Sequence, residues 1–302
     1  MNQSFFSFCF LIILNFVYGQ QHFVYDHFSN KPVSFELIRQ SDTVYYTQKD
    51  GSFIAIPKKG DSISIDVNGY QPYANAIHKL NDTVFLYTNN STKLKEVIVS
   101  AKKRTSFIGY KRYNRNFNAL LIPKVEFISL FLPQSGYKNK IVQEIQIHFD
   151  KPLHPIWGRS SSLEEGEKAV LRMHIYSTKN GELPIAKVYS STPIILNLYK
   201  QNKLVLDVSN ADIQLEENGF GIGVEFIGYL DKQNKLKKED SHISLRLTSE
   251  KTKEFVSTKN YHHSISHQKM IDSDSLMLSI PENSEVMDEK YCITLGMIIL
   301  DF

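Results

Sequence analysis

Three histidines that could bind a metal lie close together at positions 262, 263 and 267. His263 and His267 stand four positions apart, and on a helix this spacing lets two imidazoles bind one zinc ion. No Glu follows the first histidine, so the run of His262, His263 and His267 lacks the general base of the zinc-protease pattern. The Ser and Ile residues between them do not indicate a helix. We interpret the run as a polar loop, and a metal site is the alternative.

The single tryptophan, Trp157, lies in a proline-containing segment over residues 152–159. An exposed indole there could present a flat ring to a sugar, whereas a buried indole would anchor the loop to the core. Anchoring is the more common role of a loop tryptophan. We therefore predict an anchor and keep a glycan-binding platform at Trp157 as the alternative.

Carboxylate pairs of the glycosidase kind are available at Glu216 with Glu217 and at Asp207 with Asp212. Closeness along the chain does not by itself place two carboxylates around a sugar, so these residues are expected in solvated turns. The sequence contains no Gly-x-Ser-x-Gly motif and no cysteine with an evident histidine partner, which leaves acyl transfer without support. We predict no catalytic residue and no cofactor.

Glycines alternate at positions 219, 221 and 223. Their spacing does not fit a dinucleotide or phosphate-binding loop, and no helix pattern follows them. Alternating glycines in a strand instead let a neighbouring backbone or side chain come close. The sequence therefore predicts a crowded strand here.

The elements that must position these residues are strands. Of 302 residues, 42% are hydrophobic and 22% are charged, which is ordinary globular usage. Tyr (16) and Phe (19) are numerous and long runs of helix formers are missing, so we predict an all-β protein. At roughly 150 residues per domain, the length indicates two domains. A net charge of +3 favours no polyanionic partner, and we expect no nucleic acid.

The first 19 residues contain no charged side chain, and their apolar stretch over residues 5–17 is too short to span a bilayer. We predict a signal peptide over residues 1–19, cleaved after Gly19, with a retained anchor as the alternative because the basic n-region is missing. After cleavage Cys292 is the only cysteine, so the mature chain forms no internal disulfide. We expect Cys292 to be a buried small hydrophobe. No other apolar run is long enough to span a membrane.

Five short motifs follow one another between residues 24 and 100. They lie at residues 24–26, 31–33, 47–53, 61–70 and 94–100. In the fourth, Ile63, Ile65 and Val67 alternate on one face of a strand, and in the third, Gly51 supplies a tight turn. Their order resembles the carboxypeptidase-regulatory-like domain of Bacteroidetes envelope proteins, except that no Gly follows Pro32. The resemblance implies a seven-stranded-type, transthyretin-like β-sandwich over residues 20–101, which supplies no catalytic residue in its namesake enzymes.

The rest of the chain is predicted to contain a linker and a second sandwich. Residues 102–118 hold six basic residues, no acidic one and no period of two, which predicts a solvated basic linker. From residue 119 onwards, short apolar runs that are typical of strands appear again. Residues 119–302 are predicted to form a second β-sandwich, with a jelly-roll topology expected, and resemble the sandwich that often follows the regulatory-like domain.

These observations predict an exported, non-catalytic binding or scaffolding protein of the cell envelope. We place it in the periplasm or at the outer-membrane surface, with an envelope protein or glycan as its partner and no transmembrane span in the mature chain. The alternatives are an accessory component of TonB-dependent outer-membrane uptake and a glycan-binding module. A hydrolase with its site in the second domain is the third alternative.

Overall fold

Strands make up nearly all of the regular structure, as the aromatic-rich composition predicts. The computed structural model describes residues 20–301 except 42, 57–59, 90–103, 111–117, 152–160, 182, 238–240, 249–251, 266–268, 273–291 and 294. In these residues the helical segments are two short 3-10 turns, η1 (Ile77–Lys79) and η2 (Ser135–Tyr137). In the described ranges, no helix is long and apolar enough to cross a membrane. The prediction of an all-β protein is confirmed.

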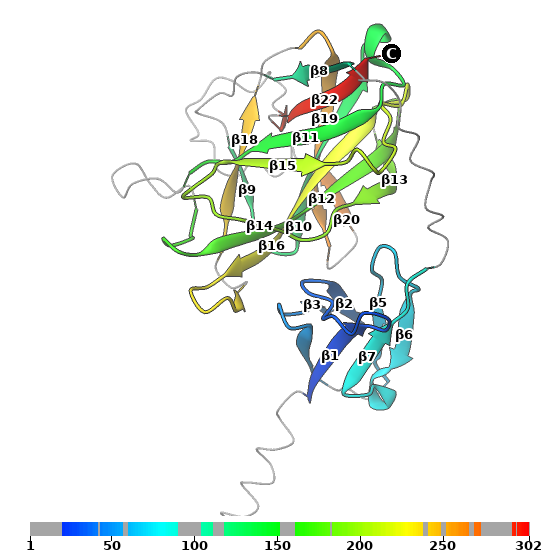
Figure 1. The fold of residues 1–302 in the computed structure, drawn as a ribbon, viewed down its shortest axis with the longest axis vertical. Coiled ribbons are helices and arrows are strands. Elements are labelled where there is room, and N and C mark those ends of the chain that lie inside the picture. The colour runs from blue at the N-terminus through cyan, green and yellow to red at the C-terminus, as the bar shows by residue number, and fades with distance from the viewer. Residues whose placement is uncertain are drawn as a thin grey trace, which may run out of the picture. The chain divides into compact units, whose positions relative to one another are not determined.

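The chain divides into two compact units, Met1–Lys95 and Glu96–Phe302. The first unit contains two sheets (Figure 1). One has the strand order β4 (Ser52–Ala55), β1 (Gln20–Asp26), β7 (Thr83–Leu86). The other has the order β3 (Thr43–Tyr46), β2 (Leu37–Gln40), β5 (Ser62–Ile65), β6 (Tyr73–Ala76). Strand β1 is antiparallel to β4 and parallel to β7.

The core of the first unit follows the alternation seen in the sequence. Ile63, Ile65 and Val67 are all buried, as their spacing predicts. Gly51 has a φ of 78°, and a Cβ added there would lie 2.5 Å from the carbonyl oxygen of Val24. The predicted tight turn at Gly51 is therefore confirmed, and only glycine fits it without strain. The finer transthyretin-like layout stays a prediction.

The largest sheet belongs to the second unit. Its strand order is β13 (Leu183–Ser190), β12 (Lys168–Lys179), β16 (Phe220–Leu230), β10 (Val125–Pro133), β19 (Phe255–Ser264), β20 (Lys269–Asp272). Two short strands extend it, with β14 (Ile194–Leu196) paired to β12 and β17 (Leu236–Lys237) paired to β16. Every pairing within this sheet is antiparallel.

Two smaller sheets complete the second unit (Figure 1). One has the order β15 (Lys203–Asp207), β11 (Val142–His148), β22 (Leu295–Asp301), β8 (Arg104–Gly109). The other has the order β21 (Cys292–Ile293), β18 (Ile243–Thr248), β9 (Asn118–Leu121). One continuous core joins these sheets to the largest one, with Phe127 and Phe226 from the large sheet and Ile145 and Met297 from the four-stranded sheet. The unit is thus a β-sandwich, and its jelly-roll topology stays a prediction.

Part of the predicted linker is a strand. Strand β8 covers residues 104–109 and pairs with β22, and β9 begins at Asn118. Ile108 and Tyr110 are buried, but two alternating apolar residues are too few to stand out among the basic ones. The prediction of a solvated linker over residues 102–118 is therefore wrong for 104–109. The predicted signal peptide and the fifth motif of the first domain, over residues 94–100, lie outside the described residues.

Candidate functional site

Strand β12 has an apolar face and a polar face, and both are buried. Leu171, Met173 and Ile175 point into the core of the sandwich. The alternate residues are Arg172, His174 and Tyr176, with exposed fractions of 6%, 2% and 5%. Because side chains alternate along a strand, these three lie on the outer face of the large sheet. Buried polar groups are costly unless they find partners, so the contacts on this face identify a candidate site.

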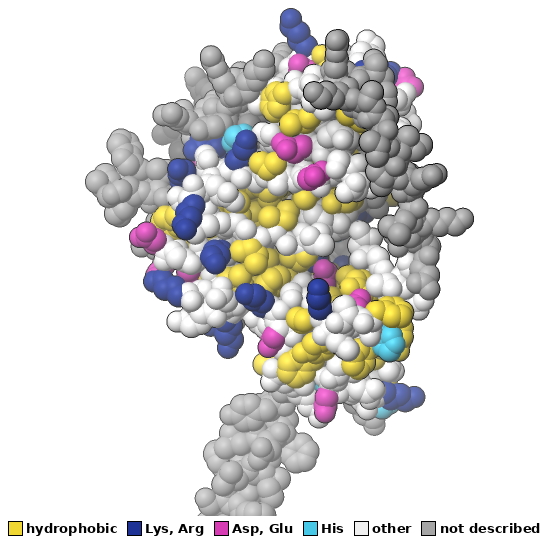
Figure 2. Space-filling model, in the orientation of Figure 1, with side chains coloured by type: hydrophobic (Ala, Val, Ile, Leu, Met, Phe, Trp, Pro, Cys, Tyr) yellow, Lys and Arg dark blue, Asp and Glu magenta, His cyan; other side chains and the backbone are white. Residues whose placement is uncertain are grey.

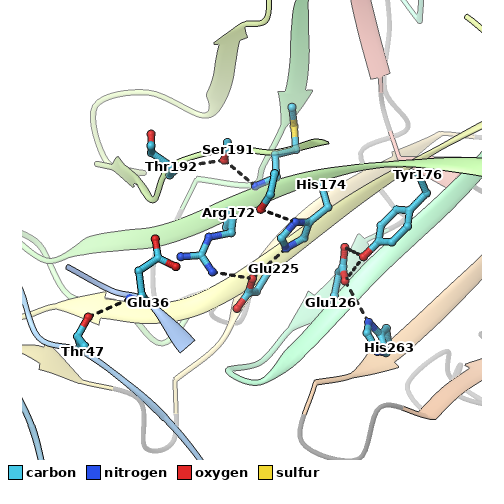
Figure 3. A network of polar contacts seen from close by, with 12 residues as sticks. Glu36, Thr47, Glu126, Arg172, His174, Tyr176, Ser191, Thr192, Glu225 and His263 are labelled. Atoms are coloured by element: carbon cyan, nitrogen blue, oxygen red, sulfur yellow. Dashed lines mark hydrogen bonds and ion pairs between the residues drawn. The ribbon is translucent and has the colours of Figure 1, made fainter. Parts of the chain in front are cut away.

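The first set of contacts runs across the neighbouring strands β13, β12 and β16, and we call Ser190, His174 and Glu225 the Ser–His–Glu row. Figure 3 shows the contact between His174 and Glu225. His174 Nε2 lies 3.0 Å from Glu225 Oε2, and Ser190 Oγ lies 2.9 Å from His174 Nδ1. Arg172 Nη1 is 3.7 Å from the same Glu225 oxygen. A carboxylate only accepts, so His174 Nε2 donates to Glu225, and the second ring nitrogen, Nδ1, shares a hydrogen bond with the Ser190 hydroxyl.

The second set of contacts centres on Glu126 of β10, and we call Tyr176, Glu126 and His263 the Tyr–Glu–His row (Figure 3). The Tyr176 hydroxyl donates to the Glu126 carboxylate, at 2.9 Å from Oε1 and 2.8 Å from Oε2. His263 Nδ1 lies 3.2 Å from Oε2 of Glu126. Lys187 Nζ lies 5.7 Å from the centre of the Tyr176 ring, within cation–π range.

Gly223 makes the second row possible. It lies on β16, directly opposite His174 of β12 on one side and Ile128 of β10 on the other. A Cβ added at Gly223 would lie 1.8 Å from Glu126 Oε1. Glu126 therefore reaches Tyr176 by passing over a strand that has no side chain at this point. The prediction that the alternating glycines allow a close approach is confirmed.

The electrostatics of the second row favour an ionised Glu126 and a neutral Tyr176. Burial raises the pKa of Glu126, but His174, the hydrogen bond from His263, Lys187 and the Tyr176 hydroxyl together lower it below its ordinary value of 4.5. Burial and the adjacent Glu126 carboxylate raise the pKa of Tyr176 far above 10.0. At neutral pH the row is a buried carboxylate held by donors on two other strands.

A second candidate feature lies on the first unit, and we call His27, Phe28, Phe85 and Tyr87 the aromatic cluster. The ring centre of His27 lies 4.2 Å from that of Tyr87, 5.3 Å from that of Phe28 and 5.9 Å from that of Phe85. Phe28, Phe85 and Tyr87 are nevertheless 66%, 41% and 45% exposed. The Asp26 carboxylate holds the supporting turn by accepting from the Phe28 and Ser29 amides at 3.1 and 2.6 Å.

Comparison with known proteins adds little to this geometry. No protein-family model matches the sequence, and no curated protein matches it. Among solved structures, the chain is similar to one described as the cysteine protease and lectin-like domains of Cwp84, a surface layer associated protein of Clostridium difficile. The TM-score is 0.35 at 10% identity, and the match covers 94% of this chain but 59% of that chain. A likeness at this level does not establish a shared function.

Two of the three histidines in the histidine run lie on a strand. His262 and His263 lie on β19, so the prediction of a polar loop is wrong at these two positions, and His267 lies outside the described residues. Strand β19 is held in place by pairing with β10, and the paired residues lie 122 to 139 positions apart, which the local sequence does not reveal. His263 contacts Glu126. In the described part of the chain, no three His, Cys, Asp or Glu side chains are placed to hold a metal ion.

The other predicted candidates do not converge on a site. Trp157 lies outside the described residues. Glu216, Glu217, Asp207 and Asp212 are all exposed, as predicted, although Asp207 is the last residue of strand β15 and does not lie in a turn. Glu217 forms an ion pair with Lys138, and Asp207 accepts from the Ser209 amide at 2.9 Å.

Sequence reasoning missed the residues that the structure brings together. The signal was present, because polar residues occupy every second position of an otherwise apolar run at Arg172, His174 and Tyr176. Such alternation normally indicates a solvated face. Only the partners on β10, β16 and β13 show that this polar face is paired and buried.

Proposed function

We propose that this protein is an exported binding or scaffolding protein of a cell envelope, with no catalytic role of its own. The ordered motifs between residues 24 and 100 support a carboxypeptidase-regulatory-like first domain, and the uncharged apolar start of the chain supports export. A role as an accessory to outer-membrane uptake is one form that such binding takes.

The aromatic cluster is the observation that carries this proposal. Large aromatic side chains are usually buried, and an exposed group of them on a soluble protein marks an interaction surface. Phe28 and Tyr87 are more exposed than Phe85, and their backbone is fixed by the Asp26 turn and by pairing of β1 with β7. Rigid aromatic side chains bind at a small entropy cost and often dominate the energy of an interface.

Co-sedimentation of the purified mature chain with envelope membranes from the source cells tests the proposal. Phe28→Ala combined with Tyr87→Ala should weaken sedimentation at least tenfold, since each hot-spot residue contributes about 2 kcal/mol or more. The matched control is Ile185→Ala with Val188→Ala, which removes apolar side chains that are 65% and 54% exposed on β13. Equal binding by the two double variants, or none by the unmodified chain, would contradict the proposal.

A hydrolase is the second candidate, favoured by the Ser–His–Glu row. In acyl transfer, the Ser190 oxygen would attack an acyl carbon while His174 Nδ1 takes the hydroxyl proton and later returns it to the leaving group. Glu225 would hold the charged imidazole through Nε2. Serine meets Nδ1 here, whereas it meets Nε2 in trypsin-like triads, and His174 is only 2% exposed.

A fluorophosphonate probe separates the two candidates, because it forms a covalent adduct only with an activated serine. We expect no adduct on Ser190 when the labelled protein is digested and analysed by mass spectrometry. An adduct on the unmodified chain that disappears in both Ser190→Ala and His174→Ala would favour the hydrolase. A commercial serine hydrolase labelled in parallel controls for the activity of the probe.

A further inference from the structure

The outer face of the four-stranded sheet carries an exposed aromatic ring over a glycine. Phe107 of β8 stands opposite Ile298 of β22, while Gly296 lies two residues along the same strand. A Cβ added at Gly296 would lie 2.8 Å from both Cε2 and Cζ of Phe107. The ring therefore leans along the sheet and covers the glycine, yet 41% of the residue remains exposed. Gly296 provides the space in which the ring lies.

Hydrogen-bonding groups lie beside this ring in a continuous series. Gln146 of β11 is directly opposite Gly296, and its Cβ is 3.6 Å from where a Gly296 Cβ would be. The Gln146 amide nitrogen donates to Glu144 Oε1 at 2.5 Å. Lys203 Nζ donates to Gln146 Oε1 at 3.3 Å. An ammonium, an amide and a carboxylate thus lie within reach of a group that stacks on Phe107.

We infer that this face binds a neutral oligosaccharide, and we call Phe107, Gly296, Gln146, Glu144 and Lys203 the sugar face. The face of an aromatic ring is negative, so it attracts the slightly positive C–H hydrogens on one side of a pyranose. The hydroxyls at the edge of the sugar both donate and accept, and they match the amide, the carboxylate and the ammonium. Figure 2 looks onto this sheet and shows hydrophobic and acidic side chains next to one another over β11, β15 and β22.

The charges on the sheet select a neutral sugar over an acidic one. Asp207 of β15 is directly opposite Glu144, so two carboxylates lie on the same face. Lys203 is the cation of the series, and it donates to Gln146. An added uronate or phosphate would meet an excess of negative charge. This inference goes beyond the proposed function, because the sugar face and the aromatic cluster belong to different units.

Isothermal titration calorimetry of the full mature chain tests the sugar face. The probes are neutral hexasaccharides of glucose, mannose and galactose, with a galacturonate hexasaccharide as the anionic comparison. At least one neutral probe should bind, and Phe107→Ala should weaken that binding at least tenfold. Gly296→Ala should weaken it similarly, because the added methyl displaces the ring while the aromatic residue is retained. Gly136→Ala is the matched control, since a Cβ there has no atom within 4 Å.

The outcomes separate this inference from the proposed function. Failure of all neutral probes, stronger binding of the galacturonate probe, or binding that Phe107→Ala leaves unchanged would overturn the sugar face. Far-UV circular dichroism of each variant establishes that the fold is intact. A chain that sediments with envelope membranes through Phe28 and Tyr87 but binds no neutral sugar keeps the proposed function and loses the sugar face. A chain that binds a neutral sugar through Phe107 but does not sediment with envelope membranes through Phe28 and Tyr87 keeps the sugar face and loses the proposed function.

Discussion

Replacing Gly223 by alanine should destabilise the second unit by about 3–5 kcal/mol, although alanine is normally the better residue within a strand. The new Cβ would lie 1.8 Å from Oε1 and 2.9 Å from Cδ of Glu126, and 3.0 Å from Cε2 of Tyr176. The carboxylate would have to move and lose its hydrogen bonds from Tyr176. Overpacking costs about 1–3 kcal/mol, and a lost hydrogen bond to a buried charge costs about 1.5–3 kcal/mol.

Thermal unfolding followed by circular dichroism measures this effect. For a domain of this size, 1 kcal/mol shifts Tm by roughly 2–4 °C, so Gly223→Ala should lower Tm by roughly 6–20 °C. Gly136→Ala, where the added methyl meets nothing, should melt within about 2 °C of the unmodified protein. Equal melting temperatures for the two variants would refute the role assigned to Gly223. The double variant Glu126→Ala with Gly223→Ala should lose less stability than the two single losses added together.

The sequence predicts those parts of the fold that depend on near neighbours. The alternation of Ile63, Ile65 and Val67 identifies a half-buried strand because only two faces are available to it. The turn at Gly51 follows from the freedom of glycine at positive φ. The close packing around Gly221 and Gly223 of β16 is also predicted from the sequence, because residues without a side chain let neighbouring groups approach.

The candidate site depends on contacts between distant parts of the chain, so the sequence does not predict it. Tyr176 and Glu126 are 50 residues apart, and His263 is 137 residues from Glu126. A polar alternation such as that of β12 indicates a solvated face unless the partners on neighbouring strands are known. The same limitation explains why residues 104–109 were expected in a linker, since the pairing of β8 with β22 joins residues nearly 200 positions apart.

Removing the Glu126 side chain should lower the free energy of unfolding by about as much as Gly223→Ala does. Glu126→Ala would leave the Tyr176 hydroxyl and His263 Nδ1 without their acceptor on a buried face, and breaking one partner of such a pair costs about 3–5 kcal/mol. Urea unfolding at pH 7 measures the loss. Glu217→Ala is the control, because Glu217 is exposed and its ion pair with Lys138 lies at the surface. A loss below about 1 kcal/mol for Glu126→Ala would show that the row contributes little to stability.

The pH dependence of Glu126→Gln distinguishes the charge of Glu126 from its shape. Because the pKa of Glu126 in the folded protein lies below its ordinary value of 4.5, the ionised carboxylate stabilises the fold fully above about pH 4.5. That stabilisation is lost as the pH falls through the folded-state pKa. Glutamine has nearly the same shape and does not titrate, so the stability difference between the two proteins should shrink as the pH falls from 5 to 3. A difference that stays constant over this range would mean that packing, and not charge, holds Tyr176 and His263 to β10.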